Sequence, residues 1–403
     1  MSNKLLNSLQ LKGFLSFGPA SPPVELTSLN VLIGPNGVGK SNFIEAIELL
    51  HATPGDFSGA IRIGGTPSDW IWHGDEGGSS ARLEARLSPL NGIPALRYGI
   101  EFTESAGRLE IIDELLEEAA KADPQAKDVR FYYRFQNGHP AINVSETVAD
   151  QTTKRRYRQR KLKRESIDPT QSILSQRKEP DLYPEVAATA NRFGSIQVFR
   201  EWSFGRSAPL RKPQPGDLPT DELLPKLVNL GLVLNDLEHR NDWDRFNKLM
   251  VRFLPRYKRL TTKIAAASVQ IFLHEDGLSA PVPASRLSDG TLRFLSILAI
   301  LFNAASASLL CIEEPELGLH PDVISLLANL LVEASGKTQL VVTTHSDVLV
   351  SALTEQVESV LVCDYLEHGT TLQRLNARKL EHWLRDYRLG EIWQSGKLGG
   401  NLW

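Results

Sequence analysis

Residues 28–50 read SLNVLIGPNGVGKSNFIEAIELL, and this stretch decides the fold. The apolar residues before Gly34 predict a short buried strand, and the apolar periodicity after Lys40 predicts an amphipathic helix. A glycine-rich turn joins the two. A strand, a loop and a helix in this order are typical of parallel α/β sheets, so the sequence predicts an α/β fold.

The turn from Gly34 to Ser41 reads GPNGVGKS and matches G-x-x-x-x-G-K-[ST] without a mismatch. Glycines let the backbone wrap a phosphate with successive N–H groups pointing inward, and the N-terminus of the following helix adds its dipole. In such a loop Lys40 would reach the β- and γ-phosphates, and Ser41 would bind Mg²⁺. A chance match would need neither a strand before it nor a helix after it. Here a predicted strand precedes the loop and a predicted helix follows it, so we expect the chain to bind a nucleotide.

A second stretch, residues 309–321, reads LLCIEEPELGLHP and places Glu313 and Glu314 directly after an apolar run, with Glu316 close behind. A buried carboxylate needs a partner, a proton or a metal, because desolvating a bare charge is costly. These carboxylates are either the solvated end of an ordinary strand or the acidic strand end that a phosphate-loop enzyme needs. We favour the second interpretation, in which Glu313 orients Mg²⁺ through water and Glu314 is the general base.

Two further motifs lie on either side of the acidic strand. Leu287 to Thr291, LSDGT, opens a predicted helix, and a Ser-x-Gly turn there is either an anion site or an ordinary helix cap. The stretch QLVVTTHSD places His345 at the end of another buried strand. A lone histidine at a strand end is usually structural, but in this order and spacing we favour a contact with the γ-phosphate.

Length and composition limit the number of domains and the class of protein. A chain of 403 residues exceeds one compact core, so we expect two lobes or one large α/β body with an insertion. A net charge of −3 argues against coating nucleic acid by bulk charge, although a local basic surface remains possible. The two cysteines exclude a disulfide scaffold and a cysteine-based zinc site. We expect no signal peptide and no membrane span, since Asn303 and three serines interrupt the apolar residues 294–312, and hence a cytoplasmic protein.

The middle of the chain is mixed. Residues 81–112 predict antiparallel strands, 113–130 a short helix and a loop, 220–256 helices, and 259–277 strands again. Eight of the eleven residues from 154 to 164 are basic: Lys154, Arg155, Arg156, Arg158, Arg160, Lys161, Lys163 and Arg164. Three interpretations stay open for this basic run. It is a contact for DNA, a solvated arm, or a docking site for an acidic protein.

The order of these motifs resembles the ATP-binding-cassette (ABC) type ATPase heads, in their soluble SMC/RecF/OLD-like branch. The segments SILSQR, FREWSFG, LRKPQ and LGEIWQSGKLGG further resemble stand-alone bacterial AAA-family ATPases. The resemblance implies a P-loop NTPase head with a mainly parallel core sheet, an antiparallel β extension, and a helical lobe inserted between Walker A and the signature motif. It divides the chain into 1–145, an N-terminal part of the head; 146–256, a basic arm and helical lobe; and 257–403, a C-terminal part of the head.

Roles follow from the resemblance by position. The Walker A loop comprises Gly34, Asn36, Gly37, Gly39, Lys40, Ser41 and Asn42. The signature is Ser288, Asp289 and Gly290; Walker B is Glu313 and Glu314; residues 319–321 lie in the D-loop region; and His345 is the switch histidine. Two features depart from the family. The Walker B aspartate is a glutamate, Glu313, one methylene longer. The metal-binding Q-loop glutamine is not obvious, and Gln171 and Gln176 are the candidates, with Gln171 placed in the expected metal site.

The resemblance also implies a mechanism and partners. Two copies would dimerise around two ATP molecules with Mg²⁺, each ATP lying between Walker A of one copy and the signature of the other, as a homodimer or a higher even oligomer. The function implied is an ATPase sensor or switch that acts with a separately encoded protein effector, in antiphage defence or DNA maintenance. The alternatives are an ATP-binding scaffold with negligible turnover and a RecF-like clamp acting directly on DNA. A transporter subunit fits less well, because the insertion before the signature is large, strand-rich and basic.

Overall fold

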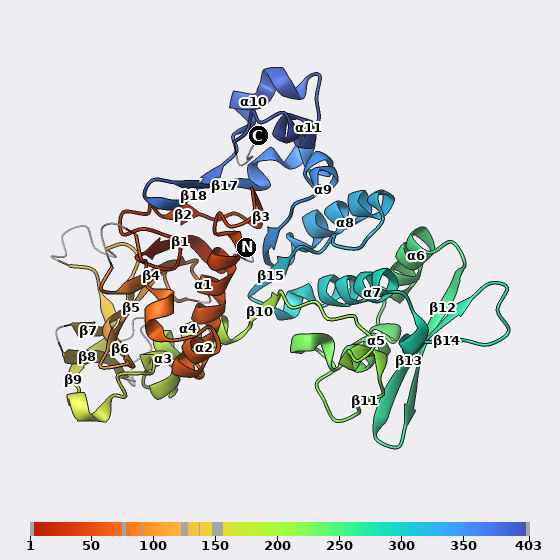
Figure 1. Ribbon diagram of the computed structural model, residues 1–403. Helices are drawn as coiled ribbons and strands as arrows, with labels where there is room; N and C mark the ends of the chain where they lie inside the picture. Colours follow the sequence, from red (N-terminus) through yellow and green to blue (C-terminus); the bar gives the residue numbers. More distant parts are fainter. Residues whose placement is uncertain are drawn as a thin grey trace.

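The computed structural model describes residues 4–74, 78–90, 92–121, 128–136, 138–146 and 156–399. Its centre is a six-stranded sheet in the order β10-β15-β16-β3-β17-β18 (Figure 1). These strands are β10 (Ile196–Phe199), β15 (Leu309–Glu313), β16 (Gln339–Thr343), β3 (Leu29–Ile33), β17 (Val360–Leu366) and β18 (Gly369–Arg374). The first five pair in parallel, and β18 pairs antiparallel with β17. Parallel strands end at one edge, so the loops after β10, β15, β16 and β3 meet there.

The central sheet is buried on both faces, and its side chains alternate between two hydrophobic cores. In β15, Leu310 and Ile312 face one core while Leu309 and Cys311 face the other. The strand predicted before Gly34 is β3, and the helix predicted after it is α1 (Lys40–Ala52). A near-continuous apolar run is what a parallel strand covered on both sides requires.

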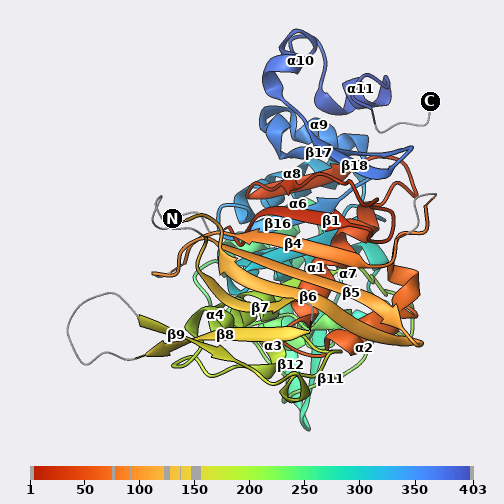
Figure 2. The ribbon, with the colours of Figure 1, turned by 90° about the vertical axis from the view of Figure 1, so that its left-hand side faces the viewer.

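One core lies between the central sheet and an eight-stranded antiparallel sheet, with α1 and α4 (Pro184–Gly194) packed in it (Figure 2). That sheet has the order β2-β1-β4-β5-β6-β7-β8-β9. Its strands are β1 (Leu6–Lys12), β2 (Val24–Glu25), β4 (Ala81–Leu87), β5 (Leu96–Ser105), β6 (Arg108–Glu118), β7 (Phe131–Gln136), β8 (His139–Glu146) and β9 (Arg156–Lys161). The helix expected from residue 113 is therefore wrong: residues up to Glu118 continue strand β6. Part of the basic run, from Arg156 to Lys161, is the edge strand β9, while Lys154 and Arg155 lie outside the described residues.

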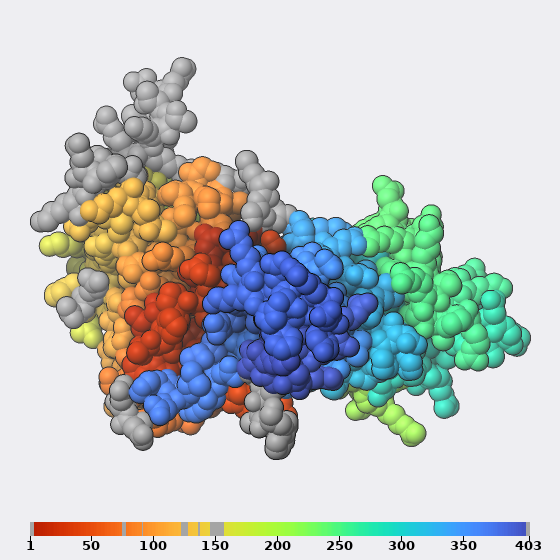
Figure 3. Space-filling view, turned by 90° about the horizontal axis from the view of Figure 1, so that it is seen from above, coloured from red at the N-terminus to blue at the C-terminus, as the bar shows by residue number. Residues whose placement is uncertain are grey.

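The other core joins the central sheet to helices and to a lobe that projects at the opposite end of the molecule from the antiparallel sheet (Figures 1 and 3). The lobe contains α5 (Leu230–Glu238), α6 (Trp243–Phe253) and a small antiparallel sheet. The strands of that sheet are β11 (Gln214–Pro215), β12 (Tyr257–Ala265), β13 (Ser268–Glu275) and β14 (Val282–Pro283). Helices α7 (Asp289–Phe302) and α8 (Pro321–Ala334) connect the lobe to the sheet. The predicted combination of a mainly parallel core, an antiparallel extension and an inserted helical lobe is therefore present.

Shorter elements complete the chain. They are α2 (Phe57–Ile63), α3 (Ile173–Gln176), α9 (Asp347–Ala352), α10 (Ala377–Leu384), α11 (Leu389–Gln394) and the 3₁₀ turns η1 (Pro67–Trp70), η2 (Arg164–Ser166), η3 (Pro209–Arg211), η4 (Pro225–Leu227), η5 (Ala284–Arg286), η6 (Ala304–Ser306) and η7 (Thr354–Ser359). Within the part of the chain that the structure describes, no helix has both the length and the apolar character needed to cross a membrane.

Candidate nucleotide-binding site

The loop between β3 and α1 requires its glycines. Gly34, Gly37 and Gly39 have φ values of 145°, 79° and 98°. Residues other than glycine adopt such backbone angles only under strain. A Cβ atom on Gly34 would lie 2.4 Å from the carbonyl oxygen of Cys363 in β17. A Cβ atom on Gly39 would lie 2.3 Å from Oγ1 of Thr370. The β17–β18 hairpin therefore packs directly against the phosphate loop and fixes its shape.

Lys40 lies inside this loop. Its Nζ donates hydrogen bonds to the carbonyl oxygens of Gly34 at 2.8 Å and Pro35 at 2.6 Å. Burial lowers the pKa of Lys40, while the nearby Glu313 and Glu314 raise it in part. A desolvated ammonium held only by carbonyl groups gains from an anionic partner, so this site suits a phosphate.

The two asparagines of the predicted Walker A loop differ in their surroundings. Asn36 is exposed at the tip of the loop. Asn42, in the first turn of α1, donates to Oγ of Ser16 at 2.8 Å, and the hydroxyl of Thr370 donates to the carbonyl of Val38 and shares a second hydrogen bond with the hydroxyl of Ser16. Ser16 and Thr370, which the sequence analysis missed, therefore support the loop from two distant segments.

Ser41 and Glu313 form the oxygen-rich part of the site. The hydroxyl of Ser41 donates to Oε1 of Glu313, at the end of β15. Among the described residues no group of three or more His, Cys, Asp or Glu side chains is arranged to hold a metal ion. Mg²⁺ in nucleotide sites is bound by one or two protein oxygens together with phosphates and water. A hydroxyl and a carboxylate side by side therefore fit Mg²⁺ bound together with a nucleotide.

Glu314 lies next to His345, with Oε1 and Nε2 separated by 3.4 Å. The backbone of Glu314 has φ of 45°, a strained conformation for this residue type, and its N–H donates to the carbonyl of Thr343. Burial and the charge of Lys40 lower the pKa of His345, which favours the neutral imidazole. Both side chains are about one third exposed, at 35% and 36%. A carboxylate and a neutral imidazole are therefore accessible at the end of the phosphate loop.

Glu316, the third carboxylate of the acidic stretch, holds this arrangement in place. Its Oε1 accepts hydrogen bonds from Oγ1 of Thr344 at 2.6 Å and from the N–H of His345 at 3.1 Å. The side chain is buried, which raises its pKa. Glu316 thus connects the loop after β15 to the loop after β16.

The predicted signature has its contacts outside the phosphate loop. Oγ of Ser288 accepts from the N–H of Thr291 at 3.0 Å and caps α7. Arg211 donates to Asp289 and to the carbonyl of Leu287, so a buried guanidinium shapes this turn. A Cβ atom on Gly290 would lie 3.1 Å from the carbonyl of Gly318, which places the signature beside the predicted D-loop. Within the described ranges, no hydrogen bond or ion pair joins residues 288–290 to residues 34–41.

A set of side chains connects α7 to the acidic strand. Arg293 donates to the carbonyl of Glu314 at 3.0 Å, and its guanidinium lies 5.0 Å from the ring centre of Trp202. Nε1 of Trp202 donates in turn to the carbonyl of Glu313 at 2.7 Å. The helix that begins at the predicted signature is therefore connected to the backbone of both predicted Walker B carboxylate residues.

Neither candidate for the Q-loop glutamine joins this cluster. The amide of Gln171 accepts from the N–H of Phe57 and donates to Asp56 and Ser58, at the N-terminus of α2. Gln176 bonds the backbone of Asp168 and the carbonyl of Gln171. The structure gives both glutamines local roles in the loop around α3, so the proposed metal contact of Gln171 has no support in its geometry.

The end of β10, beside Glu313, instead carries Arg200. Its guanidinium contacts Glu313 at 3.3 Å, Glu48 at 3.2 Å and Glu45 at 2.9 Å. The sequence analysis missed Arg200 because no motif marks it. The signal that could have found it is the stretch IQVF, apolar except for Gln197 and followed at once by a charged residue, a weaker form of the pattern that identified Glu313.

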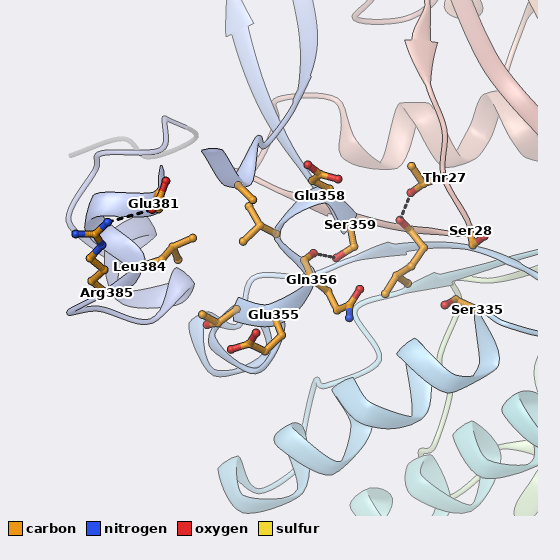
Figure 4. A pocket seen from close by; sticks show the side chains of 14 residues that line it. Thr27, Ser28, Ser335, Glu355, Gln356, Glu358, Ser359, Glu381, Leu384 and Arg385 are labelled. Atoms are coloured by element: carbon orange, nitrogen blue, oxygen red, sulfur yellow. Dashed lines mark hydrogen bonds and ion pairs between the residues drawn. The ribbon is translucent and has the colours of Figure 1, made fainter. Parts of the chain in front are cut away.

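Two surfaces lie away from this site. In the basic run, Arg158, Arg160 and Lys161 are exposed on β9, and Lys163 and Arg164 are exposed just after it. A groove of about 770 Å³ lies between η7 and α10, lined among others by Glu355, Glu358 and Arg385 (Figure 4). None of the predicted site residues lines this groove.

Comparisons with known proteins identify the family and the fold of this chain. A family model described as "AAA domain, putative AbiEii toxin, Type IV TA system" matches residues 29–351. A crystal structure of the SmcHead bound to the C-winged helix domain of ScpA has a TM-score of 0.56 and 14% identity, covering 93% of this chain and 99% of that one. An Smc head domain with an extended coiled coil, bound to the C-terminal domain of ScpA derived from Pyrococcus furiosus, has a TM-score of 0.53 and 14% identity, covering 95% and 99%.

At this identity the two structures show the fold alone, and they confirm the predicted fold class, that of an SMC head with a P-loop NTPase core. No curated protein was found to match the chain.

Proposed function

Because this chain belongs to the AAA domain family described as putative AbiEii toxin, type IV TA system, and has the fold of an SMC head, we propose that it hydrolyses ATP in a dimer. One observation carries the proposal. A single chain brings the phosphate loop, the carboxylates and His345 close to one another, whereas no hydrogen bond or ion pair among the described residues joins the signature of the same chain to that loop. A second copy that supplies its Ser288, Asp289 and Gly290 would complete the site around the γ-phosphate.

The residues divide the chemistry among them. Lys40 and the backbone N–H groups of the loop bind the β- and γ-phosphates. Glu314 accepts a proton from the attacking water, and His345, close to Glu314, contacts the γ-phosphate. Ser41 and Glu313 would hold Mg²⁺, which neutralises developing phosphate charge when it is bound.

The same arrangement can work as a switch. ATP that bridges two copies favours the closed pair, and loss of the γ-phosphate removes the bridge, so hydrolysis opens it. The two SMC heads named above are described as bound to domains of another protein, ScpA. By analogy, we propose that a separately encoded effector reads the state of this ATPase, in antiphage defence or DNA maintenance.

Replacing Glu314 with Gln tests the assignment of the base. Gln cannot accept the proton, so ATP turnover should fall by roughly 10²- to 10⁴-fold while ATP still binds. The closed dimer should then accumulate, which size-exclusion chromatography with ATP would detect. Near-normal turnover in this variant would reject Glu314 as the base. Negligible turnover in the wild-type protein would favour the ATP-binding scaffold instead.

A second candidate function, direct binding of nucleic acid, rests on a separate observation. Residues 245–274 contain seven Lys or Arg and no Asp or Glu: Arg245, Lys248, Arg252, Arg256, Lys258, Arg259 and Lys263. Arg259 and Lys263 are exposed on the edge strand β12. They lie two positions before and two positions after Thr261, so all three residues share one face of the strand, where Thr261 contacts His274 on β13. Acidic partners outside this range pair with Arg245, Arg256 and Lys258, so the argument depends on Arg259 and Lys263. Charges of either sign would protect an edge strand, whereas two exposed cations on one face suit a phosphate backbone.

This candidate is tested with a DNA duplex at several salt concentrations. Replacing both Arg259 and Lys263 with Ala should reduce the slope of log K against log salt by roughly 2, about one unit per lost phosphate contact. The matched control replaces Arg378 and Lys379, two exposed cations of α10, and should leave the slope unchanged. An unchanged slope in the β12 variant, with a reduced slope after replacing Arg158 and Arg160, would assign the contact to the basic run.

A further inference from the structure

Glu313 is held by three groups from two parts of the chain, the start of α1 and the segment after β10. The hydroxyl of Ser41, in α1, donates to its Oε1, and Nε of Arg200, after β10, donates to its Oε2 at 3.3 Å. Its carbonyl accepts from Trp202. The two oxygens of one carboxylate therefore have different partners, and the oxygen next to Ser41 is the one that faces the phosphate loop.

Arg200 has two further anionic partners, Glu45 and Glu48, which lie three residues apart on the same face of α1. All three nitrogens of its guanidinium are engaged, each with a different carboxylate. These contacts raise the pKa of Arg200, so the side chain stays cationic. Without it, three carboxylates would face one another with no counter-charge from this side.

A purely structural role would explain why Arg200 pairs with carboxylates, but not why it lies beside Glu313. Arg200 follows β10 at the carboxyl edge of the parallel sheet, in register beside the end of β15. Glu45 and Glu48 are 26% and 46% exposed, and ion pairs as exposed as these contribute little to stability. Glu313, at 16%, is the most buried of the three carboxylates. The contact to Glu45 is the shortest of the three, but the contact to the predicted metal-binding residue is the one best shielded from water.

We propose that Arg200 is a positioning residue for Mg²⁺ bound with the nucleotide: it holds Oε2 of Glu313 so that Oε1 stays beside Ser41. This inference rests on the proposed ATPase function. It also accounts for the glutamate at position 313. A side chain one methylene longer than aspartate has an additional rotatable bond, and a guanidinium that fixes one oxygen removes that freedom.

The test is a titration of Mg²⁺ at fixed ATP, with nucleotide binding followed by the fluorescence of a labelled ATP analogue. Replacing Arg200 with Gln should raise the Mg²⁺ concentration at half-saturation by roughly 10- to 100-fold, the effect expected when the partner of a metal ligand is lost. Binding in EDTA should stay near that of the wild type, since Lys40 and the phosphate loop are unchanged. Arg200→Lys should fall in between, because lysine keeps the charge but not the fork of donors.

Arg206→Gln is the matched control, because Arg206 is an exposed arginine in the same segment after β10. It should behave as the wild type. An Arg200→Gln variant with the wild-type Mg²⁺ dependence would overturn the inference and leave the proposed function standing. A wild-type protein that binds no ATP at any Mg²⁺ concentration would overturn the proposed function itself. Thermal unfolding of each variant shows whether a loss of binding reflects a loss of the fold. If Arg200→Gln does not fold, the Mg²⁺ dependence of Arg200→Lys tests the inference instead.

Discussion

Glu114 is a single buried side chain whose pKa departs from its ordinary value. It lies fully buried in β6, where the hydroxyls of Tyr98 and Ser172 and the N–H of Ile173 donate to it. Burial is the largest influence and raises the pKa of Glu114 to about 7, against the hydrogen bonds that lower it. The protonated form is therefore favoured in the folded protein relative to the unfolded chain.

This shift predicts a pH dependence of stability. Between about pH 4.5 and 7 the unfolded chain loses the proton of Glu114 while the folded protein keeps it, so the free energy of unfolding falls as pH rises. At 1.36 kcal/mol per pKa unit the loss is roughly 3 kcal/mol. Chemical denaturation of the wild type and Glu114→Gln at pH 5 and pH 8 measures it. Glu114→Gln should lack this component, and identical pH slopes in both proteins would refute the assignment.

The same strand explains why the sequence misled at residues 113–118. The stretch DELLEE has the composition of a solvated helix, yet its glutamates find partners across the sheet. Glu117 pairs with Arg97 and Arg134, and Glu118 accepts from the hydroxyl of Tyr132. Such partners are distant in sequence, so helix propensity dominated the prediction and tertiary pairing dominated the structure.

At the scale of elements, the connection between α7 and the acidic strand yields a prediction for Arg293. Among the described residues no carboxylate is in hydrogen-bonding contact with this buried guanidinium, and burial lowers its pKa. Replacing it with Met keeps the bulk but removes the hydrogen bond to Glu314. Because a buried charge is itself costly, stability should change by less than about 2 kcal/mol. The turnover of ATP should fall about tenfold as Glu314 loses its support.

Steady-state kinetics and ATP binding, measured side by side, check this prediction. The affinity for ATP should stay near the wild-type value, because the phosphate loop does not contact Arg293 in the described structure. Arg206→Met serves as the control. A normal kcat in Arg293→Met would show that α7 is not coupled to the acidic strand through this side chain.

Elements with strong local patterns were predictable, and their partners were not. The strand and helix around the phosphate loop, the strand before Glu313 and the strand before His345 follow from apolar runs with glycine or charge at their ends. Arg200 and Thr370 reach the site only through strand order, which brings β10 beside β15 and the β17–β18 hairpin beside the loop. Strand order depends on contacts between distant segments, and no local pattern encodes it.

In the proposed dimer, each whole molecule would contribute two half-sites. One half contains Lys40, Glu313 and Glu314, and the other contains Ser288 at the start of α7. A head-to-head pair would join each half to the opposite half of its partner, as an isologous interface requires. The central claim is therefore that neither chain alone completes a catalytic site.

Mixing two inactive variants tests this claim most directly. Lys40→Ala removes the phosphate contact, and Ser288→Arg blocks the signature at a cap cost of about 1 kcal/mol, too small to unfold the chain. Each variant alone should hydrolyse almost no ATP. Random pairing makes half of the dimers mixed, each with one intact site, so the mixture should recover about a quarter of the wild-type rate. A mixture no faster than either variant alone would contradict the composite site, as would Ser288→Arg turning over ATP at the wild-type rate.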